Sequence, residues 1–161
     1  MQWEAATAPA ADAGIRVARV RSGLVLGRDG GVLPRLLLPF RLGLGGRIAS
    51  GRQYMSWISI GDEVRAILHA LTQDGVAGPV NLTGPAPVTN GEFTETLGRV
   101  LRRPTVLPTP LLPLRARYGS ELVQHLLVEG QRVLPRRLEA TGYRFAHSTL
   151  EDALRAAVDR H

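Results

Sequence analysis

The sequence predicts an α/β fold that ends in a small, mainly helical lobe. Up to Arg103, short stretches of alternating apolar and polar residues are followed by stretches with helical periodicity, which indicates strands and helices in turn. From Pro104 onward, prolines extend the chain and helical patterns then dominate. These observations predict an α/β region over 1–103 and a helical region over 104–161.

The first predicted elements are a helix, a strand and a second helix. Residues 2–13 are rich in alanine and predict a helix that Gly14 ends. Alternating apolar residues then predict a strand over 15–26. A glycine turn over 27–31 leads to a short amphipathic helix over 33–44.

A glycine-rich loop over 43–51 separates these elements from a second strand predicted over 54–60. The loop resembles a phosphate-binding turn only superficially. Counting Gly-x-Gly-x-x-Gly from Gly43 places Ile48 where the third glycine belongs, and no convincing strand directly precedes the loop. We therefore expect a flexible connection and not a dinucleotide fingerprint.

Two further helices and a short strand complete the α/β region. A helix opens at Asp62, a strand follows over 80–83, and Thr89 with Glu92 forms a capping box for a helix that runs to about residue 101. The first helix has its apolar face at Val64, Ile67, Leu68 and Leu71, and the second is expected to direct Phe93, Leu97, Val100 and Leu101 inward.

The helical region carries three patterns. A leucine stripe is formed by Leu122, Leu126 and Leu127, and a helix over 134–141 ends at Gly142. The stretch 148–151 reads as a second capping box. It leads into a terminal helix whose apolar face holds Leu150, Ala153, Leu154 and Val158.

Composition excludes several kinds of site. All 20 basic residues are arginine, so the chain has no Tyr-x-x-x-Lys pair, no phosphate-loop lysine and no Schiff-base lysine. Cysteine is absent, which excludes disulfides and thiolate metal ligands. The four histidines are far apart and show no metal-binding spacing, so we expect no metal site. Asp62 and Glu63 could form an acid/base pair, but acidic residues are expected in a helix's first turn from the helix dipole alone. The favoured interpretation is therefore structural, and no catalytic group is predicted.

The charge of +6 raises the question of a nucleic-acid partner. The arginines are dispersed and aromatic residues make up only 5% of the chain, whereas nucleic-acid binders usually combine a basic stripe with aromatics. Nucleic acid is therefore a disfavoured partner. No apolar run approaches the ~20 residues that cross a bilayer, and the first residues lack a signal-peptide pattern. The sequence thus predicts a cytoplasmic protein with no membrane contact.

A candidate binding site lies where the predicted strands end. Arg21, Ser22 and Gly23 stand at a strand's carboxyl end, the edge at which doubly wound sheets bind ligands. Arg52 offers a planar fork for a phosphate or carboxylate, and it could equally be a solvated loop residue. Trp57 offers a stacking face, although packing in the core is the favoured interpretation.

Three motifs together resemble a known family. They are Arg21-Ser-Gly-Leu-Val-Leu-Gly-Arg-Asp-Gly-Gly-Val-Leu, the segment with Arg52-Gln53, Ser56-Trp57-Ile58 and Asp62, and Gly78-Pro79-Val80-Asn81-Leu82-Thr83. They resemble the second half of NAD-dependent epimerase family proteins, which are atypical extended short-chain dehydrogenases/reductases. The segment over 114–154 resembles that group's C-terminal domain of unknown function. The resemblance implies the C-terminal portion of a Rossmann-like doubly wound fold with a helical lobe.

The resemblance also implies roles for residues. It places Ser22 and Gly23 beside the nicotinamide of NAD or NADP in the complete family protein, and Leu24 near the substrate, where nucleotide-sugar epimerases tend to carry Asn. Arg52 would meet a substrate anion. The substrate-binding set implied is Arg21, Leu24, Arg52, Gln53 and Trp57.

The family's glycine-rich cofactor turn and Tyr-x-x-x-Lys pair have no counterpart here. We therefore expect the substrate-binding half of an NAD(P)-dependent oxidoreductase or epimerase, truncated and inactive alone, with no tight cofactor binding of its own. Its partners would be a small-molecule substrate and either a second copy or a front-half polypeptide that covers an open sheet edge. A stand-alone module that binds a small anion or a partner is the alternative. Whether the chain is itself an enzyme stays open at this point.

Overall fold

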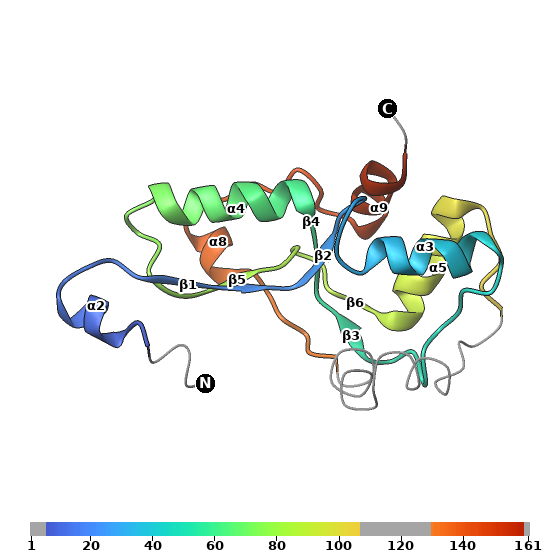
Figure 1. The fold of residues 1–161 in the computed structure, drawn as a ribbon, viewed down its shortest axis with the longest axis horizontal. Coiled ribbons are helices and arrows are strands. Elements are labelled where there is room, and N and C mark those ends of the chain that lie inside the picture. The colour runs from blue at the N-terminus through green and yellow to red at the C-terminus, as the bar shows by residue number, and fades with distance from the viewer. Residues whose placement is uncertain (1–5, 107–129, 160–161) are drawn as a thin grey trace.

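Two parallel strand pairs and one antiparallel pair organise the computed structural model, which describes residues 6–106 and 130–159. Strand β1 (Ala18–Ser22) pairs in parallel with β5 (Gly78–Leu82). Strand β2 (Leu24–Leu26) pairs in parallel with β4 (Trp57–Ser59). The short strands β3 (Tyr54–Met55) and β6 (Val88–Thr89) pair antiparallel. With helices between the strands, the predicted α/β class is confirmed (Figure 1).

The strand predicted over 15–26 is two strands that bend at Gly23 and pair with different partners. The Gly23 N–H donates to the Leu82 carbonyl at 2.9 Å, and the next N–H, of Leu24, donates to the Ser56 carbonyl at 2.8 Å. A Cβ at position 23 would collide with that Ser56 carbonyl oxygen, so this close passage requires glycine. The strand predicted over 54–60 is likewise divided at Ser56 and ends at Ser59.

Six helices are described: α2 (Ala8–Asp12), α3 (Leu33–Arg41), α4 (Ile60–Thr72), α5 (Asn90–Leu101), α8 (Arg136–Ala140) and α9 (Leu150–Val158). Three of them, α4, α5 and α9, begin at a side-chain N-cap. The capping box at Thr89 is present as predicted. The second box is not: Thr149 caps α9 through the N–H of Asp152, one residue later than expected, and Ser148 lies before the cap. The predicted leucine stripe over 122–127 lies outside the described residues.

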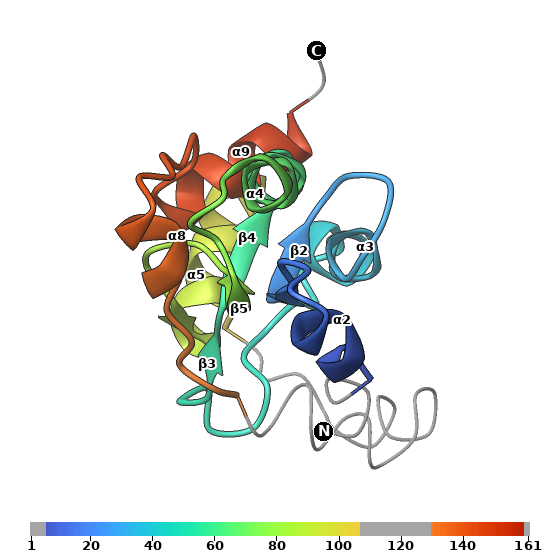
Figure 2. The same ribbon diagram turned by 90° about the vertical axis from the view of Figure 1, so that its left-hand side faces the viewer.

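Two hydrophobic clusters form the core, and β4 lies between them. Trp57 packs with residues of β2, α3, α5 and α9, while the next residue, Ile58, packs with residues of α4, β5 and α8. This division follows from the strand geometry, because neighbouring side chains on a strand point to opposite faces. Figure 2 shows α8 beside β5, with α4 running above the strands. The inward residues predicted for α5 and α9 belong to the first cluster or pack against it.

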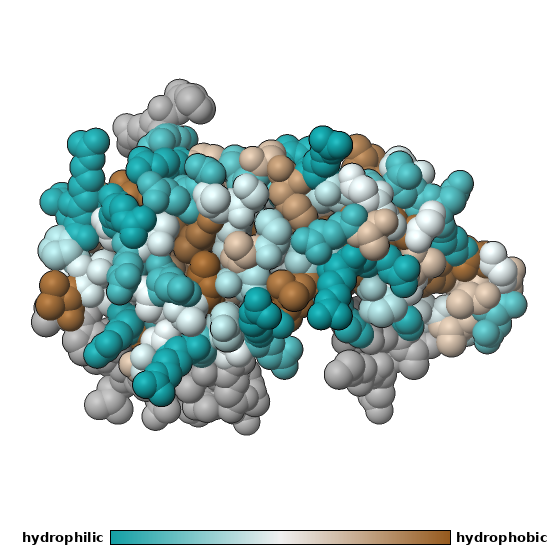
Figure 3. Space-filling view, turned by 180° about the vertical axis from the view of Figure 1, so that it is seen from behind, coloured by the Kyte–Doolittle hydropathy of each residue, from teal (hydrophilic) through white to brown (hydrophobic). Residues whose placement is uncertain are grey.

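The apolar face of α4 lies outward. Val64 is 59% exposed and Leu71 is 68% exposed, whereas Asp62, Glu63, Ala66 and Ala70 are buried. The helix thus buries its polar first turn and small residues, and presents its large apolar side chains to solvent. Apolar side chains also reach the surface between polar ones in the space-filling view from behind (Figure 3).

The outward face of α4 borders an apolar groove of about 360 Å³. The second wall of the groove is β1, whose pairing within the described residues is with β5 alone, so its other edge carries no strand. Arg16 closes one end by donating to the carbonyls of Ala70 and Leu71 at the end of α4. The groove is lined by Arg16, Val17, Ala18, Val20, Ile67, Ala70 and Leu71.

Truncating a leucine to alanine should therefore cost far more folding stability on α9 than on the outward face of α4. Leu154→Ala removes a fully buried side chain between α9, α5 and β4 and should lower the free energy of unfolding by about 2–5 kcal/mol. Leu71→Ala, the same deletion at an exposed site, should change it by less than about 0.5 kcal/mol. Urea denaturation of the two variants measures both values. Equal losses would contradict the outward orientation of α4.

Candidate functional site

The predicted cofactor loop lies at the carboxyl ends of the parallel strands β1 and β5 and leads into the amino end of β2. Ser22 ends β1 opposite Leu82 of β5, and Leu24 begins β2 opposite Trp57 of β4. Gly23 passes between them in contact with Ser56 and Thr83. Ser22, Gly23 and Leu24 thus lie at the junction of the two parallel strand pairs, and their roles beside a cofactor and a substrate stay predictions. Arg21 precedes them on β1 with an exposed side chain.

A segment far along the chain is fixed against this edge. Ser56 Oγ donates to the Gln131 carbonyl at 2.8 Å and accepts from the Val133 N–H at 2.9 Å. Thr83 Oγ1 donates to the Val133 carbonyl at 3.4 Å, and Asn81 Nδ2 donates to the Leu134 carbonyl at 3.3 Å. Residues 131–134 therefore form part of the site. No residue of this segment is predicted from the sequence to be functional.

Arg52 and Gln53 occupy a different environment from the strand-end loop. Gln53 donates from Nε2 to the Ile48 carbonyl at 2.9 Å, and its own carbonyl accepts the N–H of Asn90 at the start of α5. Arg52 is exposed, and its backbone N–H donates to Ser50 Oγ at 3.3 Å. The glycine-rich loop is thus packed against the beginning of α5. An anion-binding role for Arg52 stays a prediction.

Trp57 is a core residue. Its side chain is fully buried, and its indole Nε1 donates to the Ala86 carbonyl at 2.9 Å. A buried ring whose polar atom is already satisfied offers no open stacking face. Of the two interpretations offered by the sequence, the geometry favours packing over ligand stacking.

Glu63 lies directly beneath the predicted cofactor loop. Ser22 Oγ donates to Glu63 Oε1 at 2.5 Å, while the second carboxylate oxygen, Oε2, is buried with no hydrogen-bond partner among the described residues. Burial raises the pKa of Glu63, and the hydrogen bond from Ser22 only partly offsets this. From the sequence, Glu63 is favoured only as a first-turn acid, because nothing local shows that helix α4 turns this side inward.

Asp62 is the most heavily bonded carboxylate of the described chain. It accepts hydrogen bonds from Ser59 Oγ and Arg65 on its own side, at 2.9 and 2.8 Å. From the distant segment 143–147 it accepts the N–H groups of Ala146 and His147 and the Tyr143 hydroxyl, at 2.9–3.1 Å. Burial by itself would raise the pKa of Asp62, but these hydrogen bonds outweigh it and lower the pKa to about 2.

The ring groups around Asp62 are structural. Burial and the neighbouring Asp62 carboxylate raise the pKa of Tyr143 to about 12, so its phenol keeps its proton at neutral pH. His69 Nε2 lies 2.9 Å from Thr141 Oγ1 and its ring meets Tyr143 edge-on. This is the boundary position that the sequence favoured over metal binding. Tyr143 therefore lacks the lowered pKa that a tyrosine proton donor requires.

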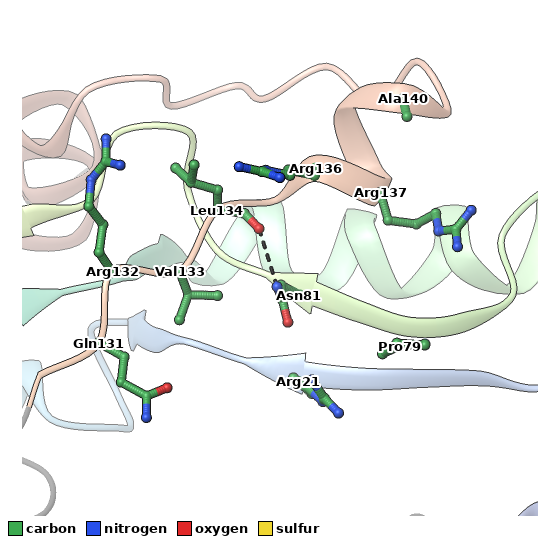
Figure 4. A pocket seen from close by; sticks show the side chains of 10 residues that line it. All are labelled: Arg21, Pro79, Asn81, Gln131, Arg132, Val133, Leu134, Arg136, Arg137 and Ala140. Carbon is green, nitrogen blue, oxygen red and sulfur yellow. Dashed lines mark hydrogen bonds between the residues drawn. The ribbon is translucent and has the colours of Figure 1, made fainter.

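A second hollow, of about 730 Å³, lies beside β1 and β5 on the side of α8 (Figure 4). We call it the basic trough. It is formed by the strand residues, the fixed segment 131–134 and α8, and four of its ten lining residues are arginine. The lining residues are Arg21, Pro79, Asn81, Gln131, Arg132, Val133, Leu134, Arg136, Arg137 and Ala140.

Within residues 6–106 and 130–159, no three His, Asp or Glu side chains lie close enough to hold a metal ion. Across the same residues, no helix combines the length and the apolar character needed to cross a membrane.

Comparison with known proteins points to a single group. A family model described as a domain of unknown function (DUF1731) matches residues 109–157. The epimerase family protein Mb2239 of Mycobacterium bovis is 51% identical over 99% of this chain. The resemblance to epimerase family proteins is thus confirmed. The chain spans about half the length of the curated relatives it matches, 53% in the mycobacterial case.

Solved structures of the same group share the fold. The crystal structure of human epimerase family protein SDR39U1 with NADPH is 45% identical and superimposes with a TM-score of 0.84, covering 89% of this chain and 48% of the human one. A nucleoside-diphosphate sugar epimerase from Corynebacterium glutamicum is 33% identical with a TM-score of 0.75, covering 97% of this chain and 29% of that one. The Rossmann-like class expected from the resemblance is confirmed by these matches.

Replacing Asp62 should produce a pH-dependent loss of stability. The pKa of Asp62 in the folded chain lies below its ordinary value of 3.8, so its ionised form contributes stability above that pH and loses it as pH falls toward 2. Asp62→Asn should lower the free energy of unfolding by about 2 kcal/mol at pH 7, and the gap to the unmodified chain should close between pH 4 and about 2. Urea denaturation across this pH range measures the gap.

The matched control for this experiment is Asp74→Asn, which makes the same change at an exposed turn. It should alter the free energy of unfolding by less than about 0.5 kcal/mol at every pH. An Asp62→Asn variant as stable as the unmodified chain at pH 7 would refute the role given to this carboxylate.

Proposed function

We propose that this chain is the substrate-side half of an NAD(P)-dependent oxidoreductase or epimerase-like protein and is inactive without a complementary front half. The observation that carries the proposal is the apolar groove between α4 and β1. Exposed Ile67 and Leu71 line this groove beside the edge of β1 that is unpaired among the described residues, and exposed Val64 and Leu68 lie on the same helix. An exposed apolar face next to an unpaired edge favours a further strand and helix as its cover.

The size of the chain supports the same proposal. It matches about half of its mycobacterial relative and of human SDR39U1. The occupant we propose for the groove is the part of such a protein that this chain does not match. That polypeptide would pair with β1 and bury the apolar face of α4.

The proposal also assigns Ser22 and Gly23 a place beside the cofactor. Human SDR39U1 was crystallised with NADPH. In doubly wound folds the nicotinamide end of a dinucleotide lies beyond the carboxyl ends of the strands, while the pyrophosphate is held by the first βαβ unit. This chain would supply the strand-end loop at Ser22–Gly23, with Leu24 toward the substrate. The complementary half would supply the pyrophosphate site and the proton donor.

Complementation tests the proposal. The purified chain is mixed with the unmatched part of the mycobacterial relative, and association is followed by sedimentation velocity together with NADPH fluorescence. A one-to-one complex that binds NADPH is expected. Two polypeptides that fold but sediment separately, with no NADPH signal, would refute it.

A single substitution in the groove tests whether the complementary half binds there. Leu71→Gln should weaken the complex by about 10–100-fold, because burying a leucine contributes about 1.5–3 kcal/mol, and should leave the isolated chain's stability nearly unchanged. Leu38→Gln, at a similarly exposed site on α3, is the matched control and should leave association unchanged. Equal weakening by both would place the interface elsewhere.

The isolated chain should bind neither NAD(H) nor NADP(H) at ~0.1 mM. Losing the pyrophosphate site costs on the order of a thousandfold in affinity or more, because Ser22 and Gly23 offer few contacts and no charge clamp. Isothermal titration calorimetry of the chain alone measures this. A micromolar dissociation constant would contradict the half-protein proposal and indicate a complete cofactor site, with the loop over 43–51 the first place to examine.

A further inference from the structure

We infer that the basic trough is a binding site for a small phosphate-bearing anion. The trough belongs to residues of this chain alone, so the inference does not depend on a complementary half. It is also separate from the loop that carries Arg52, where the sequence placed a substrate anion.

The first argument is that four arginines line one hollow. Arg21 comes from β1, Arg132 from the fixed segment 131–134, and Arg136 and Arg137 from α8. Among the described residues no acidic side chain lines the trough, and Glu139 of α8 is not among its lining residues. Figure 4 shows the four arginines at separate points around the hollow: Arg136 extends toward Leu134, whereas Arg132 and Arg137 extend to opposite sides of the view. Three separate parts of the chain therefore place guanidinium groups around one hollow.

The absence of internal partners is the second argument. Three helix arginines outside the trough are paired with carboxylates: Arg65 with Asp62 at 2.8 Å, and Arg99 and Arg155 with Glu151 at 2.9 and 2.6 Å. Among the described residues, by contrast, the side chains of Arg136 and Arg137 make no hydrogen bond or ion pair. The neighbouring charges of Arg136 and Arg137 repel one another, and a bound multivalent anion relieves that repulsion.

The rigidity of the walls is the third argument. The segment that carries Arg132 is held to the strands by hydrogen bonds from Ser56, Thr83 and Asn81. Arg132 also lies over the Tyr54 ring, with its guanidinium carbon 5.8 Å from the ring centre. A pre-organised guanidinium loses less freedom when it binds, and its planar fork matches the oxygens of a phosphate.

The dimensions favour a small molecule over a nucleic acid. A hollow of about 730 Å³ falls within the range of small-ligand sites, about 300–1,000 Å³. A nucleic-acid surface would continue as a basic stripe with stacking aromatics, and Tyr54 is the single aromatic that contacts a trough arginine among the described residues. Since the guanidinium groups remain solvated, we expect millimolar affinity for a minimal probe such as pyrophosphate.

Pyrophosphate titration tests the inference, followed by the amide NMR shifts of the purified chain. Shifts should concentrate on α8, β5 and residues 131–134, and pyrophosphate should bind at least fivefold more tightly than inorganic phosphate because it engages more guanidinium groups. Arg136→Gln/Arg137→Gln should weaken pyrophosphate binding at least tenfold. The control Arg28→Gln/Arg41→Gln removes the same charge from exposed positions outside the trough and should weaken it less than twofold.

Three results would overturn the inference. Equal weakening by the two double variants would show a response to net charge alone. Tighter binding of citrate than of pyrophosphate would show that the trough does not select phosphate. Single-stranded DNA that binds far more tightly than pyrophosphate, and equally in both double variants, would show a general nucleic-acid surface. None of these results bears on complementation, so the two proposals fail independently.

Discussion

The buried carboxylate of Asp62 is the interaction on which the arrangement of this chain depends. It stands where β4 passes into α4 and gathers hydrogen bonds from its own helix turn and from the segment 143–147, more than eighty residues away. A buried charge is tolerated only when its acceptor positions are filled, so the distant segment has little freedom to move. Through this contact the link between α8 and α9 is fixed, and with it the position of both helices.

The same junction separates the two cores and positions the two surfaces of interest. Trp57 and Ile58 face opposite clusters, and Ser59 caps α4 immediately afterwards. The resulting orientation of α4 buries Asp62 and Glu63 and leaves its large apolar residues beside β1. On the other side, the fixed placement of α8 against β5 creates the basic trough. The apolar groove and the basic trough therefore both follow from the way in which β4 packs between the two clusters.

The two surfaces suggest a division of labour within the fold. The groove can bury apolar surface of a partner but selects little between partners, since apolar contact is non-directional. The trough presents guanidinium groups whose hydrogen bonds are directional, which suits recognition of an anion. The strand-end loop at Ser22–Gly23 lies on the shared β1–β5 pair, so a ligand at the trough and a polypeptide in the groove would meet the same two strands from different sides.

The sequence by itself determined the α/β class, the capped start of a helix at Thr89 and the position of Arg21, Ser22 and Gly23 at the carboxyl end of a strand. These features depend on local periodicity and on side chains that bond within a few residues, as Thr89 does with Glu92. Tertiary structure alone decided that Gly23 breaks a predicted strand, because the obstructing carbonyl belongs to Ser56. It also decided that α4 faces outward and that residues 131–134 join the site. Each depends on contacts between residues far apart in the chain, and such contacts leave no periodic signal in the sequence.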